Sequence, residues 1–145
     1  MAFEFSLATV LRVRGIVEER EEGVLQRILF DISTISQDLE RTDALLAESN
    51  ASRHADVLKP CVGFQVHASY AHMKDLKQRR QNLARQIQEL QQARDAQIIL
   101  YQVARRDREM ITDMLKKKRT AHDAGVTRRE QKTLDDHHNV RRGRS

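Results

Sequence analysis

The chain has little of what a compact domain or an enzyme site is usually built from. Among its 145 residues there are five glycines, one proline, one cysteine and no tryptophan, and aromatic residues make up only 4%. A single cysteine, Cys61, cannot form an internal disulfide framework. Because bulky aromatic side chains are scarce, a round core would be poorly filled. The composition therefore favours long helices that bury a narrow apolar seam.

Long apolar runs are also missing. No stretch approaches the roughly 20 apolar residues that a membrane-spanning helix needs. At the N-terminus, Glu4 and Arg12 interrupt the apolar region that a secretory signal would require. We therefore expect a cytoplasmic protein.

Enzyme signatures are absent as well. Neither the phosphate-binding pattern G-x-x-x-x-G-K-[ST] nor the dinucleotide pattern G-x-G-x-x-G occurs. Cys61 lies in a predicted turn, where no pocket would shield a nucleophile from water. His137 and His138 beside Asp135 and Asp136 are a candidate metal-chelating set, but such residues are also typical of a solvated helix end. We expect no catalytic residue, no cofactor and no bound metal.

The strongest positive signal is a heptad pattern in the second half of the chain. Core-phase positions recur at alternating steps of three and four for about six heptads, without glycine or proline. These positions are Met73, Leu76, Arg80, Leu83, Ile87, Leu90, Arg94, Gln97, Tyr101, Ala104, Arg108, Ile111 and Leu115. A helix of this kind buries only a narrow seam, so it needs a partner helix along its length.

Residues 2–48 supply a matching pattern and are predicted to form the first helix. Ser6 could cap this helix, or Phe3 and Phe5 could already lie on its first turns. Its seam is clearest at Leu25, Ile28, Ile32, Ile35 and Leu39. The seam is weaker earlier, where Arg14 and Glu21 stand at core-phase positions. Gly15 and Gly23 each cost this helix roughly 1 kcal/mol relative to alanine, and they indicate either flexibility, a close backbone approach or harmless exposure.

The turn residues divide the rest of the chain. Ser49, Asn50, Ser52, Pro60 and Gly63 cluster in a predicted connection over 49–63. A second helix over 64–136 and a basic tail over 137–145 follow. We therefore predict an all-α fold, a single coiled-coil domain in which two antiparallel helices form a hairpin. The second helix, at about 1.5 Å per residue, overshoots the first by several turns.

Three arginines in the second seam, Arg80, Arg94 and Arg108, recur every 14 residues. Burying an unpaired guanidinium costs several kcal/mol, so each must reach water or an acid. Pairing with acids on the first helix would set the register of the hairpin.

Positive charge is concentrated toward the C-terminus. Residues 102–145 carry 13 Lys/Arg against 7 Asp/Glu, whereas residues 1–101 carry 13 against 14. Arg105, Arg106, Arg108 and the run 116–119 form a basic patch that could neutralise phosphates. Interleaved acids and the lack of stacking aromatics favour a solvated coiled-coil face instead.

Two end segments carry a resemblance. The opening Phe3-Glu4-Phe5-Ser6-Leu7-Ala8-Thr9-Val10-Leu11-Arg12 and the close Arg128-Arg129-Glu130-Gln131-Lys132-Thr133-Leu134-Asp135 resemble the flagellar export protein FliJ family. The resemblance implies an antiparallel two-helix coiled coil similar to the stalk of rotary ATP synthases. It also implies a non-catalytic component of the flagellar type III export apparatus, with a general chaperone role in flagellum biogenesis and motility.

The same resemblance implies partners and contact residues. The partners are the hexameric export ATPase, whose ring assembly such proteins promote, the cytoplasmic domain of the export gate, and export chaperones. A peripheral location at the cytoplasmic face of the inner membrane follows. Residues implied for ring binding are Phe3, Phe5, Leu7, Leu11, Arg12, Arg14, Arg128, Arg129, Glu130, Gln131 and Asp135. Residues implied for gate binding are Tyr70, Met73 and Leu76; for all the apolar members, seam packing is the alternative role.

Two other functions fit a basic helical hairpin. One is nucleic-acid binding, and the other is a self-associating coiled-coil scaffold. We expect a monomer, with a domain-swapped dimer as the alternative, because a long connection can straighten and exchange helices.

Overall fold

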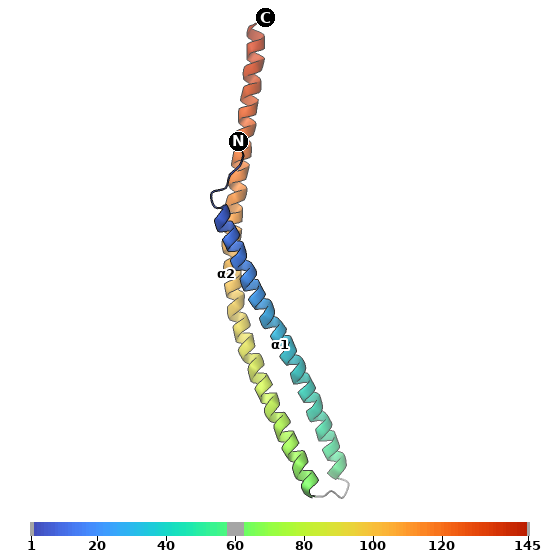
Figure 1. Ribbon diagram of the computed structural model, residues 1–145. Helices are drawn as coiled ribbons and strands as arrows, with labels where there is room; N and C mark the ends of the chain where they lie inside the picture. Colours follow the sequence, from blue (N-terminus) through green and yellow to red (C-terminus); the bar gives the residue numbers. More distant parts are fainter. Residues whose placement is uncertain (1, 58–62, 145) are drawn as a thin grey trace. The chain divides into compact units, whose positions relative to one another are not determined.

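The structure is a computed structural model that describes residues 2–57 and 63–144. It contains two helices, α1 (Ala8–Val57) and α2 (Gly63–Gly143), of 50 and 81 residues. They pack against each other in antiparallel directions (Figure 1), and the described residues contain no strand. This confirms the predicted all-α helical hairpin with a longer second helix. Neither described helix contains a stretch apolar enough to cross a membrane.

The first helix begins later than predicted. Residues 2–5 are not helical, and Ser6 and Leu7 form a turn before α1. The backbone N–H of Ala8 donates to the carbonyl of Phe5 at 3.1 Å, and that of Leu11 donates to the carbonyl of Leu7 at 2.9 Å. The predicted start at residue 2 is therefore wrong, because the opening residues form a separate segment that lies against α2.

The predicted connection over 49–63 is too long. α1 continues through Val57, and α2 begins at Gly63. Ser49 and Arg53 are half-buried and continue the spacing of three and four from Leu46, so seam packing outweighs the turn preference of the serine and asparagine residues here. Pro60 and Cys61, which were predicted to lie in the turn, are outside the described residues.

The second helix also continues further than predicted. It ends at Gly143 rather than near residue 136. Most of the predicted basic tail over 137–145 is therefore helical. Nothing in this stretch breaks the helix, because glycine first recurs at Gly143 and proline does not recur at all.

Contacts within the chain divide it into two units. Residues 1–20 and 101–145 form one, here called the terminal unit, and residues 21–100 form the other, here called the central unit. Each unit contains a stretch of α1 packed on a stretch of α2.

The core of the central unit is a single line of side chains. Leu46, Met73, Leu76 and Leu83 are buried, and the five apolar positions predicted from Leu25 to Leu39 are half-buried. Two buried polar side chains interrupt this line and are hydrogen-bonded. Thr42 donates to the Asp38 carbonyl at 2.9 Å, and the Gln97 amide donates to the Glu21 carbonyl at 3.1 Å and to the Glu21 carboxylate.

The core of the terminal unit is thinner. Ala104 is its buried apolar residue among those described. The seam positions around it are half-buried, namely Leu11, Glu18, Tyr101, Arg108, Ile111 and Leu115. The described part of the central unit, by comparison, has four buried apolar side chains, Leu46, Met73, Leu76 and Leu83.

The heptad pattern of α2 predicted burial well. Of its thirteen seam positions, only Arg80 is exposed. The Arg80 guanidinium lies 2.7 Å from the Asp43 carboxylate on α1. Arg108 likewise donates to Glu18 on α1, with one N–H···O distance of 3.3 Å. Pairing with acids of the first helix is thus confirmed for these two arginines.

Arg94 does not follow the same rule. Its guanidinium donates to the carboxylate of its neighbour Asp95 on α2, at 3.1 and 3.2 Å. The side chain of Arg94 is half-buried while that of Asp95 is exposed. The arginine stem therefore covers the seam while its charged end turns outward.

Candidate functional site

Residues 2–7, here called the N-terminal segment, contact α2 within the terminal unit. The Phe3 ring meets the His122 ring edge to face, with centroids 5.4 Å apart and planes inclined at 62°. The Phe5 ring lies under the Lys118 ammonium, 5.7 Å from the ring centroid. Both phenylalanines are half-buried. The segment therefore buries much of its apolar surface against its own chain.

Leu7 and Leu11 continue this anchoring into the seam, where both are half-buried. The two predicted arginines nearby differ. Arg12 is exposed, whereas Arg14 forms an ion pair with Asp107 on α2 at 3.3 Å. Since the two side chains are 47% and 38% exposed, the pair contributes at most about 1 kcal/mol, and Arg14 stays accessible to a partner.

Beyond the N-terminal segment, α2 continues without a packing partner among the described residues. Every residue from 127 to 144 is exposed. This stretch, here called the α2 extension, carries six Lys/Arg against three Asp/Glu. At about 1.5 Å per residue it is roughly 27 Å long. It contains the predicted ring-binding residues Arg128, Arg129, Glu130, Gln131 and Asp135.

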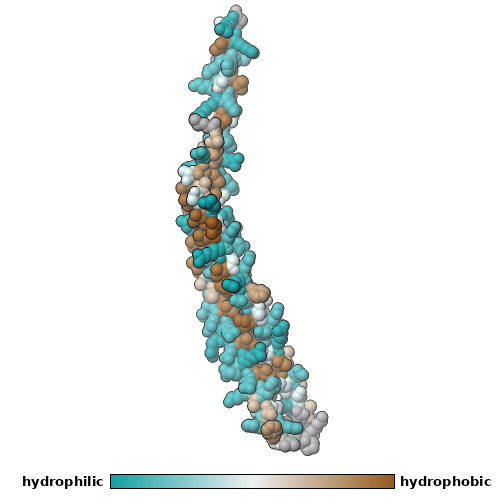
Figure 2. Space-filling view, viewed as in Figure 1, coloured by the Kyte–Doolittle hydropathy of each residue, from teal (hydrophilic) through white to brown (hydrophobic). Residues whose placement is uncertain are grey.

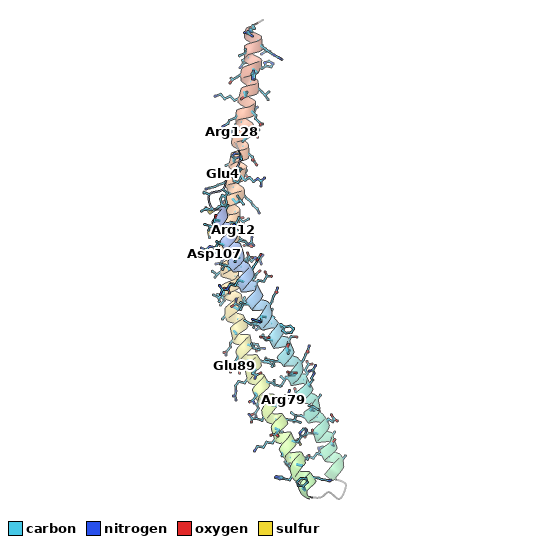
Figure 3. All side chains as sticks on the ribbon, in the orientation of Figure 1. Glu4, Arg12, Arg79, Glu89, Asp107 and Arg128 are labelled. Carbon is cyan, nitrogen blue, oxygen red and sulfur yellow. The ribbon has the colours of Figure 1, made fainter. Side chains whose placement is uncertain are left out.

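The two predicted ring-binding groups lie in one unit but at successive levels of α2. The N-terminal segment reaches α2 at Lys118 and His122. Arg128 comes six residues after His122, about 9 Å further along the helix. Figure 3 shows Arg128 beyond the level of Glu4. The two groups therefore form a continuous surface along α2 rather than one compact cluster.

Part of the predicted basic patch is neutralised within the chain. Arg105 donates to the Glu109 carboxylate at 2.9 Å, and this hydrogen bond, together with the charge of Glu109, raises the pKa of the Arg105 guanidinium. The hydrogen bond to Glu18 likewise raises the pKa of Arg108. Lys116, Lys117 and Arg119 remain exposed. Glu109 thus acts as the intrahelical ion-pair partner expected of a coiled-coil face, whereas the partner of Arg108 lies on α1.

The residues predicted to bind the gate lie in the central unit and have different exposures. Met73 and Leu76 are buried in the seam, at 4% and 7% exposed, whereas Tyr70 is 52% exposed. The Arg53 guanidinium lies over the Tyr70 ring, 4.0 Å from its centroid, and donates to the Tyr70 hydroxyl. Only Tyr70 of the three presents a side chain to a partner.

Tyr70 borders a hollow of about 660 Å³ that sequence reasoning missed. Its lining combines apolar and basic groups, including Arg53, His67, Met73, Lys74 and Lys77. Tyr70, Lys74 and Lys77 follow the helical spacing of four and three. That spacing was a readable signal, but the contribution of Arg53 from α1 depends on how the two helices pair.

Metal-ligating side chains do not gather anywhere in residues 2–57 and 63–144, where no group of three His, Cys, Asp or Glu comes together. His137 and His138, considered above with their acidic neighbours, are exposed on the α2 extension.

Comparison with protein families gives a match over almost the full length. The model of the flagellar FliJ protein matches residues 3–145. The chain belongs to the FliJ family. FliJ membership makes it a flagellar export-associated protein, in agreement with the resemblance of its two ends. Comparisons with curated proteins and with solved structures found no match.

Proposed function

We propose that this chain is a stalk-like, non-catalytic component of flagellar protein export. It binds the hexameric export ATPase, promotes assembly of the ATPase ring, contacts the cytoplasmic domain of the export gate, and serves as a general export chaperone at the cytoplasmic face of the inner membrane. Membership of the FliJ family supports the association with flagellar export. The fully exposed α2 extension is the observation that carries the ring contact.

The α2 extension is suited to binding because every residue in it, from 127 to 144, is exposed. A helix of about 18 residues without packing is marginal in water, so a surface that receives it would stabilise it. Arg128 and Arg129 supply adjacent guanidinium groups that can bind carboxylates in bidentate fashion. Glu130, Gln131 and Asp135 supply hydrogen-bonding groups on the same stretch.

The N-terminal segment extends this surface. The apolar residues predicted for ring binding are half-buried, so only part of each side chain is accessible to a partner. They are Phe3, Phe5 and Leu7 in the segment and Leu11 in α1. Their main contribution is to hold the segment on α2, where Arg12 and Arg14 can meet an acidic partner. We assign direct contact to the arginines and a positioning role to the apolar residues.

Promotion of ring assembly follows from mass action. A ligand that binds the assembled hexamer more tightly than the free subunits shifts the equilibrium toward the hexamer. Turnover rises if the hexamer is the active form. This mechanism needs no catalytic group on the chain itself.

The gate contact is assigned to the hollow beside Tyr70. Met73 and Leu76 support the Tyr70 stretch of α2 from the seam, and Lys74 and Lys77 give the hollow a positive rim. A partner with an exposed apolar group beside carboxylates would complement this surface.

Charge reversal tests the ring contact. Arg128→Glu with Arg129→Glu should reduce stimulation of ATPase turnover at least about tenfold, as expected for the loss of charged interface anchors. The matched control is Lys74→Glu with Lys77→Glu, which makes the same charge change in the central unit and should leave stimulation intact.

A pull-down on the cytoplasmic domain of the gate gives the reciprocal test. There the Lys74 and Lys77 variant, and Tyr70→Ala, should lose binding while the Arg128 and Arg129 variant keeps it. Unchanged ATPase stimulation by the Arg128 and Arg129 variant would contradict the ring assignment.

A further inference from the structure

One side of the terminal unit exposes apolar side chains from both helices. Figure 2 shows brown side chains gathered where the first turns of α1 lie on α2. Six of the exposed apolar residues are valines and methionines that are between 37% and 58% exposed. They are Val10, Val13 and Val17 on α1, and Val103, Met110 and Met114 on α2, here called the valine–methionine face.

The heptad positions of these residues place them on a common side. Val10 and Val17 directly precede the seam residues Leu11 and Glu18, just as Met114 precedes Leu115. Two antiparallel helices are related by an approximate two-fold axis perpendicular to them. The residues that precede seam positions on α1 therefore lie on the same side of the pair as the residues that precede seam positions on α2. The apolar flank of α1 therefore adjoins the apolar flank of α2.

The register of the two helices agrees with this placement. Arg14 pairs with Asp107, and Phe5 lies under Lys118. Between these two contacts, Val10 and Val13 run alongside the stretch of α2 that holds Met110 and Met114. The valine–methionine face is thus continuous across the pair of helices.

The opposite flank of the same stretch has a different composition. The residues that directly follow seam positions there include Arg12, Gly15, Arg105, Thr112 and Lys116, which are small or polar. A helix pair solvated on both sides would not need apolar residues on one side only. Apart from Ile16 on the outer side of α1, the exposed apolar residues of this packed stretch are concentrated on one side, which is typical of an interaction site.

The charges on this face indicate the kind of partner. Arg20, Arg106 and Lys117 occupy it or its border, and none of them is within ion-pair range of an acid in the described residues. Of the acidic residues near this face, Asp107 is paired with Arg14, so Asp113 is the main negative charge that opposes these three cations. The apolar surface therefore has an excess of positive charge around it.

We propose that the valine–methionine face binds one amphipathic helix of another protein, with apolar residues on its contact face and acidic residues on its flanks, to form a local three-helix bundle. Valine and flexible methionine side chains adapt to different apolar partners. A second copy of the chain fits less well, because it would bring its own Arg20, Arg106 and Lys117 against these three cations.

Synthetic helices test the proposal directly. The probe is a labelled peptide of about 20 residues, long enough to form a helix, with leucine on one face and glutamate on both flanks. A second peptide carries lysine on the flanks instead. Fluorescence anisotropy with the full chain should show binding of the glutamate peptide at least about tenfold tighter than the lysine peptide, as complementary charges predict.

Three variants locate the binding and test its charge preference. Val13→Gln with Met110→Gln should weaken binding of the glutamate peptide at least about tenfold, while circular dichroism shows unchanged helix content. Leu29→Gln with Phe30→Gln, an exposed apolar pair in the central unit, should bind like the wild type. Arg106→Glu with Lys117→Glu should reverse the preference toward the lysine peptide, which a merely structural role would not do.

Three outcomes would overturn the proposal. They are the absence of peptide binding, equal weakening by both glutamine variants, and sedimentation as a dimer that the Val13 and Met110 variant dissociates. The last result would assign the face to a second copy of the chain. ATPase stimulation is not measured in this experiment, so its result is independent of the proposed ring contact.

Discussion

Arg108 and Glu18, which are 90 positions apart in the chain, meet in the seam between α1 and α2. The guanidinium of Arg108 donates from two nitrogens to the two carboxylate oxygens of Glu18, and the Glu18 side chain is only 14% exposed. A charged pair within the seam favours one register, because any slide of one helix along the other separates the charges. The pair therefore specifies alignment more than it stabilises the fold.

The first prediction concerns this pair. Glu18→Leu and Arg108→Leu should each lower the thermal midpoint, because each leaves one charge in the seam without its partner. The double substitution should recover most of the loss, since two leucines can pack where the ion pair was. A thermal melt of the four proteins gives the coupling between the two residues. Strict additivity of the single effects would show that the two side chains do not interact.

The second prediction concerns the central seam. Leu83→Ala should lower the free energy of unfolding by about 2–3 kcal/mol, because Leu83 is 8% exposed and its removal leaves a cavity. Phe30→Ala, which removes a larger but 70% exposed side chain, should change it by less than about 0.5 kcal/mol. Urea unfolding followed by circular dichroism measures both.

The same urea experiment bears on the single coiled-coil domain predicted from the sequence. Spectroscopic labels placed separately in the terminal and central units should report coincident transitions if the chain unfolds as one domain. Two separate transitions would show that the units unfold independently.

The third prediction concerns Gly23. A methyl group added there would meet no atom within 4 Å, and the residue has no positive φ. Gly23→Ala should therefore raise the free energy of unfolding by about 0.5–1 kcal/mol, through the helix preference of alanine. Ala47→Gly, at an exposed position of the same helix, should lower it by a similar amount. A loss of stability on Gly23→Ala would contradict this, because it would mean that another atom lies close to the added methyl group.

The fourth prediction concerns the α2 extension. A chain that ends after Val126 should keep the thermal midpoint of the full chain to within a few degrees, because every residue from 127 to 144 is exposed. It should nevertheless lose stimulation of the export ATPase, as the proposed ring contact requires. The control is a chain that lacks residues 2–6. It loses the Phe3 and Phe5 contacts but keeps the extension, with Arg128 and Arg129. Full stimulation by the shortened chain would argue against the extension as the contact.

Sequence reasoning predicted burial along α2 almost position by position, but it misplaced the helix ends. The spacing of three and four identifies buried positions because it depends only on the geometry of one helix. The helix ends depend on competition with packing. Ser49 and Arg53 read as part of a turn, yet they continue the α1 seam. The sequence left open whether Phe3 and Phe5 begin the helix or Ser6 caps it. In the structure both rings pack on α2, at His122 and Lys118, before α1 begins.

What the amino-acid sequence determined by itself is therefore the helical class, the phase of each seam and the excess of positive charge near the C-terminus, since these follow from local spacing and composition. Only the tertiary structure decided which residues meet. Arg80 lies beside Asp43 and Arg108 beside Glu18, whereas Arg94 turns to its own neighbour Asp95. The valine–methionine face also exists only once the helices pair, because neither heptad pattern alone states the direction or axial position of the other helix.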